Sequence, residues 1–312
     1  MIAEELKVMC AIDKHPNVLA LIGGVTANIR KGQLLIVTEY IDGGELRELL
    51  IKCKSTFINE LFEEEETLNN GYMVQNSVMK KKYKSERIPP DTDEQLLDPN
   101  NLNSLSTSDL CSFALQIANG MEFLASVPCV HRDLACRNIL VTKTKVVRVA
   151  DFGLAKKHLN KTYYRLKVTK DVQIPVRWMA PESLENYMYT QKSDVWSFGI
   201  CLYEIFSLGN LPYANILDNH VVDHIMQGHR NPQPKYCHGA IYKLMKLCWQ
   251  HSPTERPSFS ECVQYLKCHI NTNSAEVLSR VNRMLHMESE KQEKFKDWIL
   301  KSGPENLVPP RT

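Results

Sequence analysis

The stretch that decides the fold of this chain is His131-Arg132-Asp133-Leu134-Ala135-Cys136-Arg137-Asn138, which Asp151-Phe152-Gly153 follows closely. Asp133 stands where a carboxylate can orient an attacking hydroxyl and accept its proton. The amide oxygen of Asn138 and the carboxylate of Asp151 are hard oxygen ligands that suit magnesium. In this order and spacing the two motifs predict phosphoryl transfer to a hydroxyl, with ATP and Mg²⁺ as the required small molecules.

The same residues also have simpler structural explanations. An aspartate often caps a helix or stays solvated in a loop, and an asparagine often forms a turn. The spacing of Asp133 and Asn138 favours the catalytic explanation. Gly153 permits the backbone turn that aims Asp151 at a metal. We expect His131 to be a packed structural residue with no acid–base role.

Composition excludes several other classes of protein. The chain has 312 residues, of which 43% are hydrophobic, so it can bury a large core. A net charge of +2 with 24% charged residues gives no reason to expect nucleic-acid binding. The ten cysteines include no C-x-x-C pair and predict reduced thiols. No apolar run is long enough to span a membrane.

The N-terminal part reads as one helix followed by a strand pair. Apolar residues at helical spacing predict a helix over 2–12, which Pro16 ends. Short apolar runs at 18–25 and 34–40 predict two antiparallel strands. A second helix is expected over 45–53.

The character of the sequence changes over 56–105. An acidic block at 63–66 precedes a basic block at 80–84, and this composition predicts a disordered insertion inside the domain. Tyr72 and Tyr83 in the insertion are either docking sites for phosphotyrosine-binding adaptor domains or ordinary solvated tyrosines.

Regular patterns return after the insertion. A long core helix is predicted over 107–125, with Ser108 or Asp109 as its cap. Short strands are expected at 139–141 and 146–150, and 194–270 is mostly helical in pattern. One more amphipathic stretch covers about 276–300, for which the sequence does not decide between docking on the domain and hanging free.

The catalytic stretch also carries information on the substrate. Kinases that act on serine or threonine usually place a lysine two positions after the catalytic aspartate. This chain has Ala135 at that position and Arg137 four positions after Asp133, an arrangement that resembles the tyrosine-kinase family. The segment 174–182 agrees, since its proline and tryptophan shape a shelf for a longer tyrosine side chain. Arg137 is expected to support charge that develops near the phosphate.

Two further segments are candidate sites by position. The run 38–41 reads as a hinge, where backbone groups of Glu39 and Ile41 would bind an adenine edge and Glu45 would reach the ribose. The alternative is an ordinary strand end. Tyr163 and Tyr164 form a pair that would be autophosphorylated and would then draw in basic groups such as Arg132.

Taken together, these motifs resemble the catalytic domain of split-type receptor tyrosine kinases, the fibroblast, platelet-derived and vascular endothelial growth factor receptors. The resemblance covers 2–270 apart from the insertion, and it implies an α+β, two-lobed protein-kinase fold with a mainly helical C-terminal lobe. It also implies that Glu5 is the helix glutamate that pairs with a strand lysine, that Asp194 braces the catalytic loop, and that Arg256 pairs with Glu182. Met9, Leu21, His131 and Phe152 match the apolar column that connects the lobes.

The chain departs from the family pattern at its start. The Gly-rich loop and the Val-Ala-x-Lys strand should precede Glu5, and the sequence begins at Met1. We therefore expect an incomplete N-terminal lobe (1–41), a C-terminal lobe (42–270) and a helical tail (271–312). Either the chain is an N-terminally truncated tyrosine kinase, or it is a catalytically dead, kinase-derived scaffold.

The resemblance finally implies a setting for the chain. It would be the cytoplasmic domain of a parent protein at the plasma membrane, with tyrosine-bearing proteins as substrates and a dimer that phosphorylates itself in trans.

Overall fold

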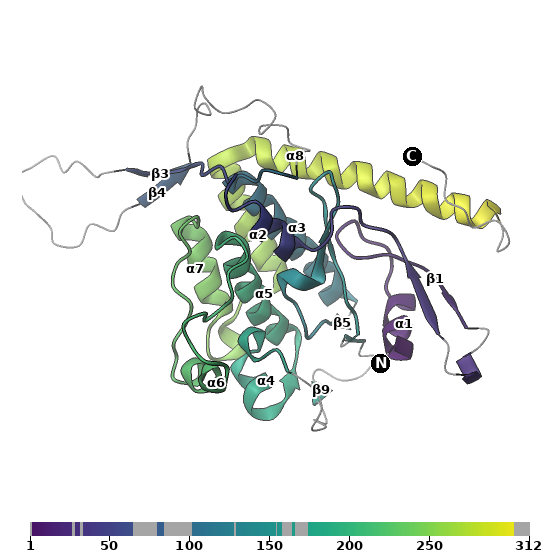
Figure 1. Ribbon diagram of the computed structural model, residues 1–312, viewed down its shortest axis with the longest axis horizontal. Coiled ribbons are helices and arrows are strands. Elements are labelled where there is room, and N and C mark those ends of the chain that lie inside the picture. Colours follow the sequence, from purple (N-terminus) through teal and green to yellow (C-terminus); the bar gives the residue numbers. More distant parts are fainter. Residues whose placement is uncertain are drawn as a thin grey trace, which may run out of the picture.

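The computed structural model describes residues 2–26, 29–31, 34–64, 80–83, 102–127, 129–153, 155–157, 164–165 and 174–302. These residues form a small part with one helix and two strands, and a larger part built mainly of helices (Figure 1). This arrangement confirms the expected α+β fold with two lobes and few strands in the first.

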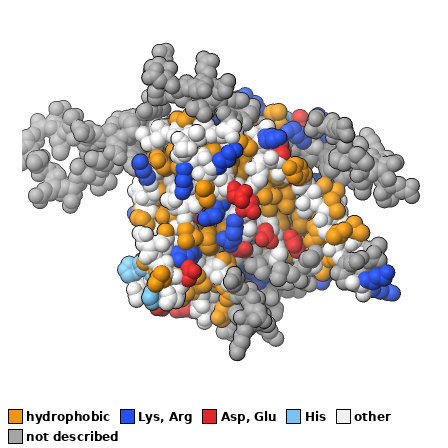
Figure 2. Space-filling view, viewed as in Figure 1, with side chains coloured by type: hydrophobic (Ala, Val, Ile, Leu, Met, Phe, Trp, Pro, Cys, Tyr) orange, Lys and Arg blue, Asp and Glu red, His pale blue; other side chains and the backbone are white. Residues whose placement is uncertain are grey.

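The small part contains α1 (Ile2–Cys10), β1 (Leu21–Val25) and β2 (Leu35–Thr38). The strands pair antiparallel, with Leu21 opposite Thr38 and Val25 opposite Leu35, and the short 3₁₀ helix η1 (Ile29–Lys31) lies between them. On α1, Val8 and Met9 are buried in the main core. Val25, Leu35 and Val37 are exposed, and Figure 2 shows hydrophobic surface at this end of the molecule.

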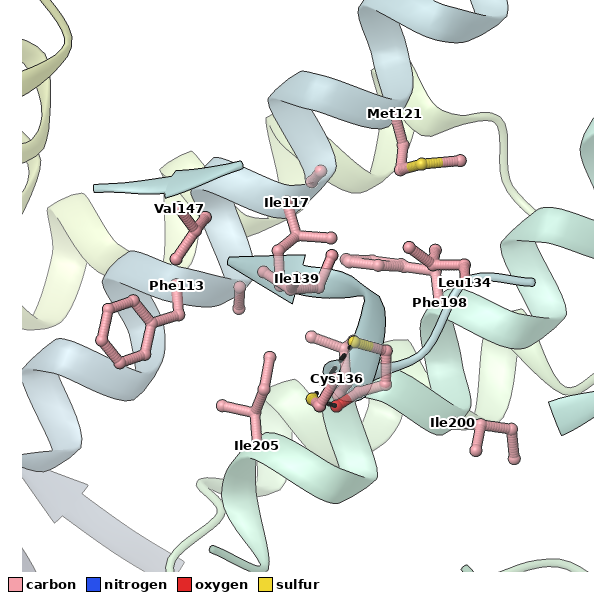
Figure 3. Packing of buried hydrophobic residues seen from close by; sticks show 14 of the residues in the cluster. Phe113, Ile117, Met121, Leu134, Cys136, Ile139, Val147, Phe198, Ile200 and Ile205 are labelled. Carbon is pink, nitrogen blue, oxygen red and sulfur yellow. Dashed lines mark hydrogen bonds between the residues drawn. The ribbon is translucent and has the colours of Figure 1, made fainter. Parts of the chain in front are cut away.

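The larger part is organised around two buried helices, α3 (Thr107–Ser126) and α5 (Gln191–Phe206). Around them lie α2 (Leu46–Lys52), α4 (Pro181–Asn186), α6 (Asp218–Met226), α7 (Gly239–Cys248) and the short η5 (Pro253–Glu255). Side chains of α3 and α5 pack against the strands and loop that follow α3 (Figure 3). Burial of this apolar surface is the main force that holds the part together.

Three strand pairs frame the loops of the larger part. In the first, β6 (Ile139–Val141) pairs with β7 (Val147–Val149), close to the predicted ranges. In the second, β5 (Cys129–Val130) pairs with β8 (Lys156–Lys157), and in the third, β9 (Tyr164–Arg165) pairs with β10 (Met188–Tyr189). The first two pairs place residues 131–138 and 150–153 side by side.

Among the described residues, both ends of the predicted insertion (56–105) belong to the folded domain. Ile58 forms a bridge with Ser106, and Leu61 and Leu105 are buried. The acidic strand β3 (Leu61–Glu64) pairs antiparallel with the basic strand β4 (Lys80–Tyr83). The expectation of disorder is therefore wrong for the ends of the segment, because apolar residues there reach the core. Tyr72 lies outside the described residues.

The last helix, α8 (Phe259–Ser302), continues without a break past residue 270. It runs across the whole molecule, from the end near β3 to the small part (Figure 1). Val277 and Val281 are buried, and Arg280 donates a 2.9 Å hydrogen bond to Asp109 of α3. The tail therefore docks on the domain, a choice that the sequence left open.

The connection between α1 and β1 fits closely against α3. A Cβ on Gly120 would lie 2.7 Å from the carbonyl oxygen of Asn17, so a larger residue there would push the two apart. The His15 ring stacks on Phe123 with centroids 4.8 Å apart, and its Nδ1 accepts the N–H of Asn17 at 3.1 Å. Burial, and then the nearby charge of Arg148, lower the pKa of His15 to about 4.

The cap of α3 differs from the prediction. Ser106 is the N-cap, since its hydroxyl accepts the N–H of Asp109, and the Asp109 carboxylate accepts the N–H of Ser106 in return. Neither predicted cap is correct: the helix begins at Thr107, two residues earlier than Ser108 as cap requires and three residues earlier than Asp109 as cap requires. Asp109 takes part as the third helical residue of a capping box.

We predict that Ser106→Ala lowers the free energy of unfolding by about 1 kcal/mol, because the end of α3 loses one satisfied backbone donor. Denaturant unfolding followed by circular dichroism measures the change. Ser108→Ala is the matched control and is expected to stay within about 0.5 kcal/mol of the parent chain. A larger effect for Ser108→Ala than for Ser106→Ala would contradict the assignment of the cap.

We also predict that acid unfolds the chain partly through His15. Its pKa of about 4 in the fold lies below its ordinary 6.5, so the folded state favours the neutral ring. The resulting stability is complete above pH 6.5 and is lost as the pH falls toward 4. Unfolding free energies across this window should fall less steeply for His15→Gln than for the parent chain, while the exposed control His251→Gln should follow the parent.

Candidate active site

The loop 131–138 is held by a buried carboxylate from α5. Asp194 accepts the backbone N–H of His131 at 2.7 Å and that of Arg132 at 2.9 Å, which confirms the expected bracing contact. Arg132 has a positive φ of 71°, so both N–H groups can turn toward one side chain. Burial raises the pKa of Asp194, while these donors and the nearby basic groups act in the opposite direction.

Three of the predicted site residues meet at Asp133. Arg137 donates from Nη2 to Asp133 Oδ1, and Asn138 donates from Nδ2 to Asp133 Oδ2 at 2.8 Å. The same Nδ2 lies 2.7 Å from the Asp133 carbonyl oxygen. Residues 136–138 form the 3₁₀ turn η3 (Cys136–Asn138), which brings these side chains back toward Asp133. The carboxylate therefore has a fixed orientation.

Asp151 lies beside this group with an exposed side chain. Its φ is 61°, and its Oδ1 accepts the N–H of Gly153 at 3.2 Å. The N–H of Ala150 donates to the carbonyl of Asn138 at 2.9 Å, which keeps the two loops adjacent. Phe152 is buried, so the Asp-Phe-Gly turn is anchored at its middle residue while its carboxylate stays accessible.

His131 has a structural position, as expected. It is fully buried, and its Nε2 lies 3.0 Å from the carbonyl oxygen of Ala150. Its Nδ1 accepts the N–H of Asp133 at 3.3 Å, and its ring contacts Phe152 with centroids 5.5 Å apart. His131 thus joins the two loops and has no free nitrogen to offer a substrate.

Glu5 of α1 points toward the same loops. A Cβ on Gly153 would lie 3.9 Å from Glu5 Oε2 and 3.1 Å from Asp151 Oδ1. Burial, and then repulsion by Asp151, raise the pKa of Glu5. In the described part of the chain, Glu5 pairs with no lysine or arginine side chain, so the site carries two facing carboxylates.

At the predicted hinge, the Glu39 side chain bonds within the protein, whereas backbone groups of Glu39 and Ile41 stay available in the described part of the chain. The Glu39 side chain accepts the N–H of Ala20 at 2.8 Å and turns toward the interior. Its own N–H donates to the Ala20 carbonyl at 3.1 Å. Within the described residues, the Glu39 carbonyl and the Ile41 N–H form no backbone hydrogen bond. Glu45 is exposed and bridges to Leu140 of β6, close to the catalytic loop.

The regulatory candidates are only partly visible. Tyr163 lies outside the described residues. Tyr164 lies in β9 opposite Tyr189 of β10. The guanidinium of Arg132 lies 5.6 Å from the centre of the Tyr189 ring. Arg132 is therefore one strand away from the backbone of Tyr164.

A buried glutamate that the sequence did not point to connects the catalytic loop with the segment around Trp178. Glu204 of α5 accepts the N–H of Cys136 at 3.0 Å and the indole N–H of Trp178 at 2.9 Å. Trp178 closes the 3₁₀ helix η4 (Val176–Trp178), and its ring lies 4.4 Å from the guanidinium carbon of Arg137. Burial raises the pKa of Glu204. Its only signal in the sequence is a charge inside the apolar run of α5.

Two further contacts lie in the surroundings of the site. Arg256 donates two hydrogen bonds of 2.7 Å to Glu182, which confirms the expected pair. Cys136 is buried with its Sγ 3.5 Å from that of Cys201, and burial raises the pKa of its thiol (Figure 3). A thiol in this state is a poor nucleophile, in agreement with a packing role.

Comparison with known proteins identifies the family of this chain. The family model described as protein tyrosine and serine/threonine kinase matches residues 1–266. The receptor tyrosine-protein kinase ver-3 of Caenorhabditis elegans is 58% identical over 307 residues, which are 98% of this chain and 25% of that protein. The receptor-like tyrosine-protein kinase kin-15 of the same organism is 46% identical, over 96% of this chain and 59% of that protein.

A vertebrate relative, the mast/stem cell growth factor receptor Kit of Gallus gallus, is 36% identical over 88% of this chain and 31% of its own length. The chain thus spans between a quarter and about three fifths of the lengths of these relatives. No helix in the described part of the chain is long and apolar enough to cross a membrane. With a matching family model and a catalytic loop of this geometry, the chain belongs to the protein tyrosine and serine/threonine kinase family.

Proposed function

We propose that this chain is the catalytic domain of a receptor tyrosine kinase and that it transfers the γ-phosphoryl group of ATP to tyrosine hydroxyls. The observation that carries the proposal is the arrangement at Asp133, whose two carboxylate oxygens are held by Arg137 and Asn138. A binding module has no chemical need for such an oriented carboxylate. The names of the relatives support the tyrosine and receptor parts of the proposal.

In this proposal Asp133 orients the tyrosine hydroxyl and accepts its proton. Arg137 has two functions: it fixes Asp133, and it places positive charge where the transferred phosphoryl group develops negative charge. Its stacking on Trp178 holds the guanidinium in a fixed plane. Ala135 stands where kinases acting on serine or threonine usually carry a lysine, which favours tyrosine over serine or threonine.

Asn138 and Asp151 are the proposed magnesium ligands. Asn138 uses its Nδ2 on Asp133, which leaves its Oδ1 as the ligand atom. Asp151 is exposed, and burial, followed by repulsion from Asp151, raises the pKa of Glu5 beside it. This donor set fits a hard divalent cation. When bound, magnesium supplies positive charge that neutralises the phosphate oxygens.

The nucleotide base would lie against the hinge. The Glu39 carbonyl and the Ile41 N–H are the proposed partners of the adenine edge, and Glu45 is the proposed partner of the ribose. Support comes from the Glu39 side chain, which bonds inward and leaves the backbone for the ligand. The bridge from Glu45 to Leu140 keeps this residue near the metal side of the site.

The remaining assignments concern the wider protein. We infer the split-kinase arrangement, with residues 1–41 in the first lobe, residues 42–270 in a second lobe that contains the insertion, and a helical tail at 271–312. The parent protein would lie at the plasma membrane and dimerise for autophosphorylation in trans. Tyr72 and Tyr83 would bind phosphotyrosine-reading adaptor domains after modification.

We predict that Asp133→Asn lowers phosphotyrosine formation with magnesium and ATP by about 100-fold or more, because the base is lost while the fold is kept. An antiphosphotyrosine assay with a tyrosine-containing peptide measures the rate. The exposed Asp223→Asn is the matched control and should keep the parent rate. Equal rates for Asp133→Asn and the parent chain would exclude this assignment and favour a scaffold function.

We predict that replacing both Tyr163 and Tyr164 by Phe lowers the specific activity about tenfold, equivalent to about 1.4 kcal/mol in the barrier. A phosphate on either residue adds negative charge next to Arg132, which would order the segment. Activity is compared after preincubation with magnesium and ATP. An unchanged activity of the double variant would mean that these tyrosines do not regulate the enzyme.

A further inference from the structure

The C-terminal half of α8 reaches residues that the proposed function places at the nucleotide site. The family model matches only to residue 266, whereas α8 continues to Ser302 and passes over α3 toward the small part (Figure 1). The contacts described below therefore belong to a segment that the family match does not cover.

The first contact is a buried ion pair at Arg148 of β7. Its Nη2 donates to Glu288 Oε2 of α8 at 2.9 Å, and its Nε donates to Glu39 Oε1 of the hinge at 3.3 Å. Its Nη1 donates to the carbonyl oxygen of Pro16, between α1 and β1. The Arg148 side chain is only 1% exposed. One guanidinium therefore joins three segments that are far apart in the sequence.

The second contact extends the network directly from α8 to the hinge. Gln292 lies one turn after Glu288 on the same face of α8, and its Nε2 donates to Glu39 Oε1 at 3.3 Å. Glu39 Oε1 thus accepts from Ala20, Arg148 and Gln292. These bonds fix the Glu39 side chain among β7, α8 and the segment before β1, and none of them uses the Glu39 carbonyl.

The charges make the network depend on the docking of α8. Arg148 faces two carboxylates, Glu39 and Glu288, and Lys291 donates to the second oxygen of Glu288 at 2.7 Å. Without Glu288, the buried guanidinium keeps only Glu39 and a carbonyl as partners. Because an underpaired buried charge is costly, the hinge segment would then shift or admit water.

A cavity of about 650 Å³ lies beside the same contacts. Its walls include Met9 of α1, Phe152 of the Asp-Phe-Gly turn, and Ser289 and Gln292 of α8. The docked helix therefore shares one cavity with α1 and with the Asp-Phe-Gly turn.

We propose that the segment 277–294 of α8 is an intramolecular positioning element for the nucleotide site. Glu288 and Gln292 are positioning residues: they act through Arg148 and Glu39 to hold the hinge in the conformation that binds ATP. This inference rests on the proposed function, since it names a determinant of nucleotide affinity at the same site. Linkage requires the reverse effect as well, so that bound nucleotide stabilises the docked helix.

The test compares variants of the full chain by steady-state kinetics and by calorimetric binding of magnesium-ATP. The double variant Glu288→Ala with Gln292→Ala is expected to raise KM and Kd for ATP by about fivefold or more. The KM for the peptide should stay unchanged. Glu288→Gln keeps an acceptor for Arg148 and should give an intermediate value. The exposed Glu290→Ala, on the same helix, is the matched control and should behave as the parent chain.

Hydrogen exchange gives a second readout that does not need turnover. Amides of 285–294 should exchange more slowly when magnesium-ATP is bound to the parent chain, and this protection should be lost in the double variant. Unchanged ATP affinity in the double variant, or a fall in kcat with KM for ATP unchanged, would overturn the inference. Since calorimetry reports binding alone, its result stands even if the Asp133→Asn experiment excludes tyrosine kinase activity.

Discussion

The bond between Asp194 and the backbone of His131 and Arg132 is the constraint on which the site depends. A carboxylate buried in the first turn of a core helix is costly unless N–H donors satisfy it, and the loop supplies two. In return the loop accepts a left-handed residue at Arg132, a conformation that few side chains adopt. From this turn onward the chain is directed so that Asp133, Arg137 and Asn138 converge.

A second buried carboxylate repeats the same physical device nearby. Glu204 connects the catalytic turn at Cys136 with Trp178, and Trp178 stacks on Arg137. The pair of Arg256 and Glu182 then fixes the segment that follows Trp178. Each carboxylate accepts hydrogen bonds from a different part of the chain, so the helices α5 and α4 position the loops without contributing to the chemistry.

Local sequence pattern was sufficient to predict the elements that depend on residues close to one another in the chain. The helix over α3, the strand pair β6–β7 and the catalytic loop all follow from short-range spacing, and the structure places them close to the predicted ranges. Prediction was wrong at the start of α3, where Ser106 and Asp109 bond reciprocally, and at the ends of the insertion, where Leu61 and Leu105 enter the core. The cap depends on reciprocal hydrogen bonds, which the sequence pattern does not show. The two buried leucines lie among polar residues, so the average composition of the segment does not reveal their burial.

By itself the sequence determined the family and the chemical groups of the site, because phosphoryl transfer needs particular residues at particular short spacings. Only the tertiary structure decided which distant residues support them. The inward turn of Glu39, the meeting of Arg148 with Glu288 and the docking of α8 join residues more than a hundred positions apart. Such contacts leave no periodic signal in the chain, since each depends on the geometry by which packed helices and strands bring their surfaces together.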